Sequence, residues 1–271
     1  MNIFIAGDST FQYNNSSSYP MTGIGQMLPL YFTNLKQPDL AAHDIDTYTD
    51  NLVPGEPYES TVKEIETVTF YNYARNGRST KSFITEGRLN VIDSQIQAGD
   101  YLFVVFGHND QKADDPNRFT NPDTNFKANL MKFADTAERH GAFPVFLTPV
   151  ARRIFDEETK TAKDTLKAYS DAMKDFADEN GYPLIDLSEL SRKLLTEVGF
   201  EAAGKFYMGL KPGEYDNYPD GRNDDTHLKP DGAYTFAGLC AKGLYDVCQS
   251  WKGKHAEGYS KLARFIRLPK A

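Results

Sequence analysis

The sequence has few cysteines, fewer basic than acidic residues and no long apolar run, and each shortage excludes a class of protein. Its two cysteines, Cys240 and Cys248, stand in one expected helix, where eight residues at 1.5 Å per residue separate them by roughly 12 Å. A disulfide between them would require that helix to unwind. No further Cys or His stands at ligand spacing, so we expect two buried thiols and no metal site.

The charge balance argues against polyanionic partners. Lys and Arg number 30 against 38 Asp and Glu, which gives a formal net charge of -8. Attraction to nucleic acid or to an anionic membrane relies on a basic face, so we expect neither partner. No apolar stretch approaches the ~20 residues that a membrane-spanning helix needs.

The N-terminus carries no visible secretory leader. Residues 1–6 form a short apolar run without a basic start, and Gly-Asp follows directly. The sequence therefore predicts a cytoplasmic protein, although a secreted protein whose leader had been removed would read the same way.

Short apolar runs alternate with longer amphipathic stretches, which is typical of βαβ units around a parallel sheet. The runs predicted to be strands are 2–6, 67–74, 101–106, 142–147 and 183–187. Helical spacing predicts helices over 126–140, 162–180 and 230–247. The expected fold class is α/β, a flavodoxin-like three-layer α/β/α sandwich with a five-stranded, mainly parallel sheet. We expect one domain over 1–271, with loop insertions at about 33–66 and 204–223, where proline and glycine interrupt any periodicity.

Polar motifs directly follow the first three predicted strands, at the sheet edge where ligands bind in such folds. The first motif is GDST at 7–10. A serine at a strand-to-helix turn can hold its hydroxyl toward a ligand, which suits Ser9 to act as a nucleophile. Asp-Ser-Thr after a strand is, however, also a common helix N-cap.

The second and third motifs are NGRS at 76–79 and GHND at 107–110. Glycine allows close approach of the backbone to a ligand, so the N–H of Gly77 can donate to an oxyanion. The side-chain amide of Asn109 can do the same, and Asp110 can brace the loop. Each motif, taken alone, is also compatible with an ordinary turn or cap.

The fourth motif is DDTH at 224–227. His227 can act as a general base toward serine if a carboxylate fixes its tautomer. Asp224, three residues earlier, can reach Nδ1 across a tight turn, and Asp225 offers a second carboxylate. The spacing favours Asp224, and a solvated loop histidine is the alternative.

Taken together, GDST at 7–10, NYARNGRST at 72–80, FGHND at 106–110 and DDTH at 224–227 resemble the SGNH (GDSL) hydrolase superfamily. The closer resemblance is to the rhamnogalacturonan acetylesterase-like group, which shares the NGRS and GHND motifs. It also shares a strand that ends in Thr-Pro-Val before a pair of arginines, here at 148–153. The likeness spans nearly the whole chain. The sequence departs from the pattern at Ile24, where an aromatic residue is usual, and at Asp225, where asparagine is usual.

The resemblance implies a site without metal or organic cofactor. Ser9 would be the nucleophile, with Asp224 and His227 as the other members of the triad. The N–H groups of Ser9 and Gly77 and the side chain of Asn109 would form the oxyanion hole.

The implied function is a serine esterase that removes acetyl or other small acyl groups from carbohydrate, such as rhamnogalacturonan or other plant cell-wall oligosaccharides. Its partner would be an acetylated oligosaccharide or a small ester. Arginines near strand ends can meet uronic-acid carboxylates or pair with surface acids; they are Arg75, Arg78, Arg152 and Arg153. Two alternatives remain: a short-chain lipase, lysophospholipase or thioesterase of the same superfamily, and a non-catalytic carbohydrate-binding protein.

Overall fold

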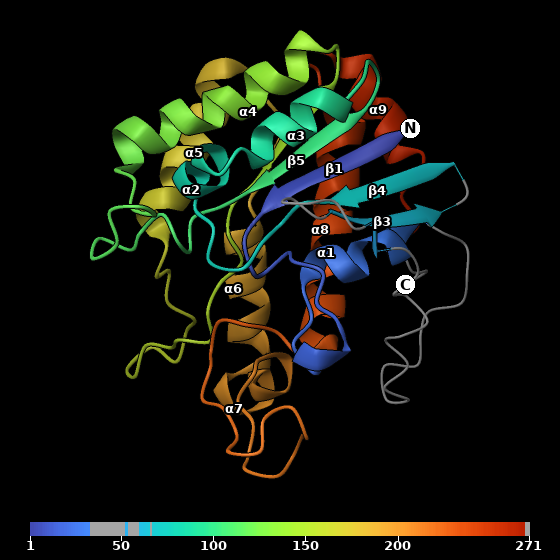
Figure 1. The fold of residues 1–271 in the computed structure, drawn as a ribbon. Coiled ribbons are helices and arrows are strands. Elements are labelled where there is room, and N and C mark those ends of the chain that lie inside the picture. The colour runs from blue at the N-terminus through green and yellow to red at the C-terminus, as the bar shows by residue number, and fades with distance from the viewer. Residues whose placement is uncertain (33–51, 54–59, 66, 269–271) are drawn as a thin grey trace.

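The computed structural model describes residues 1–32, 52–53, 60–65 and 67–268. Within these ranges the chain forms one seven-stranded sheet with helices on both faces (Figure 1). The strands are β1 (Asn2–Gly7), β2 (Leu52–Val53), β3 (Ser60–Ile65), β4 (Val68–Asn72), β5 (Tyr101–Val105), β6 (Phe143–Leu147) and β7 (Leu184–Ile185). The α-helices are α1 (Ile24–Met27), α2 (Thr80–Thr85), α3 (Arg88–Gln95), α4 (Lys127–Arg139), α5 (Lys167–Asn180), α6 (Leu187–Val198), α7 (Phe200–Ala203), α8 (Pro230–Ser250) and α9 (Ala256–Ala263).

The order of the strands is β2-β3-β4-β1-β5-β6-β7. All pairings from β4 to β7 are parallel, whereas β2 and β3 pair antiparallel at one edge. The parallel strands are the five that the sequence predicts, and their order is that of the flavodoxin-like fold. The predicted three-layer, mainly parallel sandwich is therefore confirmed, but the expected number of five strands is wrong, because β2 and β3 extend the sheet to seven.

Alternation along β1 divides the core into two layers. Ile3 and Ile5 pack toward α1, α8 and α9, whereas Phe4 and Ala6 pack toward α3, α4 and α5. Successive side chains of a strand point to opposite faces, so an apolar strand of this kind must be covered on both. Both cysteines lie in α8 as free, buried thiols, as expected.

Some expected boundaries differ from the structure. Most of the predicted insertion at 33–66 lies outside the described residues, but residues 60–65 form β3 rather than a loop. The helix expected from 162 begins only at Lys167, because Ala162 forms a β-bridge with Phe155 and donates its N–H to Oγ1 of Thr196 at 3.0 Å. Gly181, at φ 68°, ends this helix as predicted.

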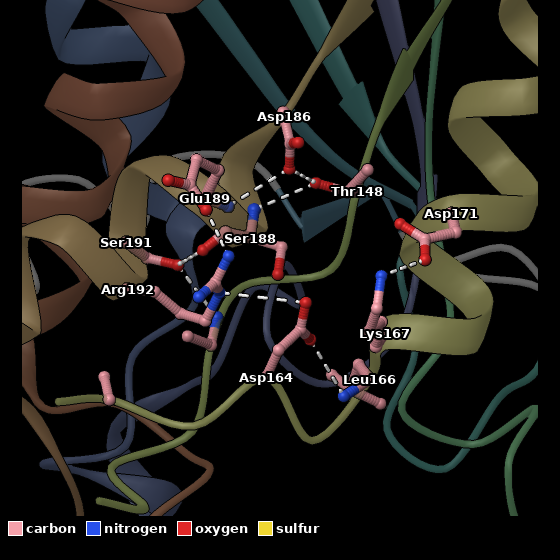
Figure 2. Close-up of polar contacts among 12 residues, drawn as sticks. Thr148, Asp164, Leu166, Lys167, Asp171, Asp186, Ser188, Glu189, Ser191 and Arg192 are labelled. Atoms are coloured by element: carbon pink, nitrogen blue, oxygen red, sulfur yellow. Dashed lines mark hydrogen bonds and ion pairs between the residues drawn. The ribbon is translucent and has the colours of Figure 1, made fainter. Parts of the chain in front are cut away.

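The first turn of α6 holds the chain segment that leaves β6 (Figure 2). Asp186 caps α6 by accepting the N–H of Glu189 and also accepts the hydroxyl of Thr148 at 2.9 Å. The hydroxyl of Ser191 then accepts the N–H of Ala151 at 2.9 Å. This network fixes the strand end that leads to the arginine pair. Across the described ranges, no helix has the length and apolar character needed to cross a membrane.

Candidate active site

Ser9 lies in a tight turn directly after β1. Asp8 is buried, and its Oδ1 accepts both the N–H and the hydroxyl of Thr10, at 2.9 and 2.8 Å. The N–H of Phe11 donates to the carbonyl of Asp8 at 3.2 Å, which closes the turn. No helix starts here, contrary to the strand-to-helix turn expected from the sequence. The turn leaves Ser9 8% exposed at the carboxyl edge of the sheet.

His227 reaches Ser9 from the loop that precedes α8. Its Nε2 lies 2.9 Å from Oγ of Ser9, and its Nδ1 lies 2.7 Å from Oδ2 of Asp224. The other oxygen of Asp224 accepts the N–H groups of Thr226 and His227, both at 2.9 Å. Hydroxyl, imidazole and carboxylate thus stand in series, as the spacing of the fourth motif predicts.

The environment of Asp224 favours its ionised form. Burial alone would raise the pKa of Asp224, but hydrogen bonds from His227 and the charge of that imidazole outweigh it and hold the pKa well below its ordinary value. Arg222, which the sequence analysis did not single out, also donates to Oδ2 of Asp224 through Nε at 2.9 Å.

The structure separates the two candidate carboxylates. The carbonyl of Asp225 accepts the N–H of Arg153 at 2.9 Å, and its carboxylate lies 3.4 Å from Nε of the same arginine. Asp225 is therefore engaged by Arg153, whereas Asp224 contacts the imidazole of His227. The acid three residues before the histidine, which the spacing favours, is the one that faces the imidazole.

The second and third motifs lie side by side. Gly77 adopts φ 78° in the turn after β4, a conformation that residues with a Cβ rarely adopt. Nδ2 of Asn109 donates to the carbonyl of Arg78 at 3.1 Å, and Oδ1 of Asn109 accepts from Nη1 of Arg118 at 3.2 Å. Asn109 is 7% exposed, and a carboxamide has two N–H bonds, so one donor remains after the contact with Arg78.

Hydrogen bonds also join the Gly77 turn to the Ser9 turn. The N–H of Arg75 donates to the carbonyl of Gly7 at 3.0 Å, and Nδ2 of Asn72 donates to the carbonyl of Phe11 at 2.8 Å. The N–H of Asn76 donates to the side chain of Gln12. The structure thus brings all four predicted motifs to one edge of the sheet.

Buried acids brace the loops behind these groups. Asp110 accepts from the N–H and hydroxyl of Thr80, at 3.1 and 2.6 Å, and from the hydroxyl of Thr120 at 2.9 Å. Burial raises the pKa of Asp110 to about 7, although these hydrogen bonds act in the opposite direction. Asp8 lies 3.3 Å from Nδ1 of the buried His108, a pair that sequence reasoning missed.

Three of the four arginines predicted to meet substrate have side-chain partners within the protein. Nε of Arg78 pairs with Glu86 at 2.9 Å. Arg152 donates to the hydroxyls of Thr226 and Thr165, both at 3.2 Å. Arg153 pairs with Asp225 and also lies over the ring of Phe200, 4.2 Å from its centroid. The contacts of Arg152 and Arg153 secure the loop that carries His227, and a role for these three arginines in substrate binding stays a prediction. Ile24, the departure noted in the sequence, is fully buried in α1.

A hydroxyl, an imidazole and a carboxylate in series at the carboxyl edge of a parallel sheet are the arrangement found in serine hydrolases of the α/β class. The comparisons with known proteins agree with this class. The chain belongs to the GDSL-like lipase/acylhydrolase family, whose model matches residues 47–234. The matched segment includes the motifs around Gly77, Asn109 and His227, whereas Ser9 precedes it.

The chain is similar to two curated proteins of Bacillus subtilis (strain 168). It is 38% identical over 245 residues to rhamnogalacturonan acetylesterase RhgT, which covers 90% of this chain and 90% of that protein. It is 38% identical over 182 residues to the probable rhamnogalacturonan acetylesterase YesY, covering 67% of this chain and 79% of YesY.

A crystal structure of the Bacillus subtilis protein YxiM shares the fold, with a TM-score of 0.67 and 23% identity over 92% of this chain. The chain spans only 57% of that structure's length. The similarity in sequence therefore shows the family, and this similarity in structure shows the fold alone.

Proposed function

We propose that this protein is an acetylesterase that acts on an acetylated, rhamnogalacturonan-type oligosaccharide. The observation that carries the proposal is the series from Oγ of Ser9 through the imidazole of His227 to Asp224. The substrate class comes from the similarity to RhgT, which extends over 90% of both chains.

In the proposed reaction, Oγ of Ser9 attacks the carbonyl carbon of the acetyl ester while Nε2 of His227 takes the hydroxyl proton. The N–H groups of Ser9 and Gly77 and the side chain of Asn109 donate to the oxyanion. The imidazolium gives its proton to the departing sugar oxygen, which leaves an acetyl-enzyme. Water, deprotonated by His227, then attacks that ester, and acetate leaves as Ser9 recovers its proton.

Asp224 supports the base in this scheme. Its carboxylate accepts from Nδ1, which holds the imidazole in the tautomer that presents a free lone pair on Nε2 to Ser9. The lowered pKa keeps Asp224 ionised, and its negative charge stabilises the imidazolium that forms in each half of the reaction.

A profile across p-nitrophenyl esters from acetate to decanoate tests the acyl group. We expect the highest kcat/KM at acetate and a steep fall with chain length. An optimum at long chains would replace the proposal with a lysophospholipase or thioesterase.

Labelling with a serine-directed fluorophosphonate tests the nucleophile. The wild-type protein should be labelled at Ser9 and lose its esterase activity, whereas Ser9→Ala should not react. An unlabelled, inactive but folded wild-type protein would instead favour a non-catalytic carbohydrate-binding role. Acetate release from rhamnogalacturonan and xylan oligosaccharides then tests the glycan, because equal rates would remove the pectic preference.

A further inference from the structure

A polar cavity lies between the chain segment after β1 and the end of β4. Its volume is about 400 Å³, within the range of roughly 300–1,000 Å³ that is typical of small-molecule sites. An acetyl group, with three heavy atoms, would fill only a small part of it. Its lining includes Gln12, Asn15, Ser17, Arg75, Asn76 and Arg78.

This cavity adjoins the proposed oxyanion hole. Asn76 and Arg78, which both line it, flank Gly77 in the turn after β4. Gln12, three residues beyond Ser9, lines the same cavity and accepts the N–H of Asn76. A substrate whose acetyl group reached Ser9 would therefore extend the rest of its structure into or across this space.

The lining suits a sugar better than an acyl chain. Amide and hydroxyl groups from Gln12, Asn15, Ser17 and Asn76 line it. The amide of Gln12 is engaged by Asn76 and Asn14, and the hydroxyl of Ser17 donates to Asn15 at 2.6 Å. The amide groups of Asn15 and Asn76 are then the ones best suited to meet the hydroxyls of a sugar ring. An apolar chain would cover polar groups of the lining without pairing them, which is unfavourable.

The two arginines in the cavity differ in their partners. Arg78 is held by Glu86 at 2.9 Å and by the carbonyl of Asn76 at 2.8 Å. The side chain of Arg75 is exposed, and within residues 1–32, 52–53, 60–65 and 67–268 it has no carboxylate or other hydrogen-bond partner. Its backbone is engaged through the N–H donated to the carbonyl of Gly7 and through the carbonyl that accepts the N–H of Arg78. An uncompensated guanidinium in a polar cavity is suited to bind a carboxylate with two parallel hydrogen bonds.

We propose that this cavity binds a uronic acid residue of the substrate and that Arg75 pairs with its carboxylate. The inference rests on the proposed function, since it assigns part of the glycan to a place beside the same site. It makes Arg75, rather than the internally paired Arg78, Arg152 and Arg153, the determinant of selectivity for acidic glycans.

The test compares acetylated rhamnogalacturonan oligosaccharides with the same material after its carboxyl groups have been reduced to alcohols and its acetyl groups restored. The readout is the ratio of kcat/KM for the acidic substrate to kcat/KM for the neutral one. We expect the wild-type protein to favour the acidic substrate and Arg75→Gln to lower this ratio about tenfold, mainly through KM. Arg75→Lys should fall between them, because lysine keeps the charge without the planar fork.

A matched control is Arg264→Gln. Arg264 is likewise exposed and follows α9, which packs near the start of β6 through the hydrogen bond from Tyr259 to the carbonyl of Pro144. This variant should keep the wild-type ratio. Calorimetric titration of Ser9→Ala with the acidic oligosaccharide, with and without Arg75→Gln, gives the same comparison as a dissociation constant, independent of turnover.

The outcomes separate the two proposals. If the wild-type protein deacetylates the acidic oligosaccharide and Arg75→Gln keeps both the ratio and the dissociation constant, the role of Arg75 is wrong and the esterase assignment stands. If the wild-type protein releases acetate from neither oligosaccharide, the proposed function is wrong and the inference falls with it.

Discussion

Nη1 of Arg118 donates a hydrogen bond of 3.2 Å to Oδ1 of Asn109. Nε of the same arginine binds Asp115 at 2.6 Å, so the guanidinium is anchored at both ends. Nδ2 of Asn109 meanwhile donates to the carbonyl of Arg78 at 3.1 Å. Two contacts on opposite ends of the carboxamide fix its rotation, and the direction of its second N–H bond is then set before any substrate binds.

Removing the amide should slow the chemical step. We expect Asn109→Ala to lower kcat on p-nitrophenyl acetate by roughly 10² to 10³, the range for loss of one oxyanion donor. KM should change much less, because the donor matters most when charge develops on oxygen. Undiminished turnover in a folded Asn109→Ala protein would contradict the assignment of this side chain.

Releasing the side-chain amide of Asn109 from Arg118, without removing the amide, should reduce kcat less. We expect Arg118→Ala to lower kcat by about tenfold, because the carboxamide then rotates away from its working orientation. A double-mutant cycle supplies the control: in an Asn109→Ala background the same Arg118 change should have little further effect. Additive losses would mean that Arg118 acts independently of Asn109.

The adjacent acids of the DDTH motif form a matched pair of variants. Asp224→Asn should lower kcat by roughly 10³ to 10⁴, since an amide cannot hold the required tautomer of His227. Asp225→Asn loses only the pairing with Arg153 and should retain activity within a fewfold of wild type. Reversed effects in p-nitrophenyl acetate kinetics would transfer the orienting role to Asp225.

Asp110 should make stability depend on pH. Because burial raises its pKa to about 7, the folded protein holds this proton more tightly than the unfolded chain, whose Asp titrates near 3.9. The stabilisation is therefore present below about pH 4 and is lost as pH rises through 7, by on the order of 4 kcal/mol. Urea unfolding of wild type and Asp110→Asn at several pH values checks this, since the difference in free energy of unfolding should shrink as pH rises. A constant difference across that range would contradict the raised pKa.

Much of the site could be predicted from local pattern. Ser9, Gly77 and Asn109 each follow a buried apolar run, and the carboxyl ends of parallel strands lie at one edge of a sheet. The central strands were equally readable, because a strand covered on both faces is apolar throughout. The antiparallel strand β3 was not, since its burial does not alternate regularly along the strand and proline and glycine precede it in the sequence.

The local pattern of the sequence was thus enough to specify the layered fold and the chemical groups at the carboxyl edge of the sheet. Long-range packing was needed for the partner of each group: the pairing of Asp225 with Arg153, the anchoring of Asn109 by Arg118 and, within the described residues, a guanidinium of Arg75 left without a hydrogen-bond partner. The partners of a side chain depend on loops that fold against it from distant parts of the chain. Residues of the same type have the same local sequence pattern, and this pattern does not indicate which partner each one contacts.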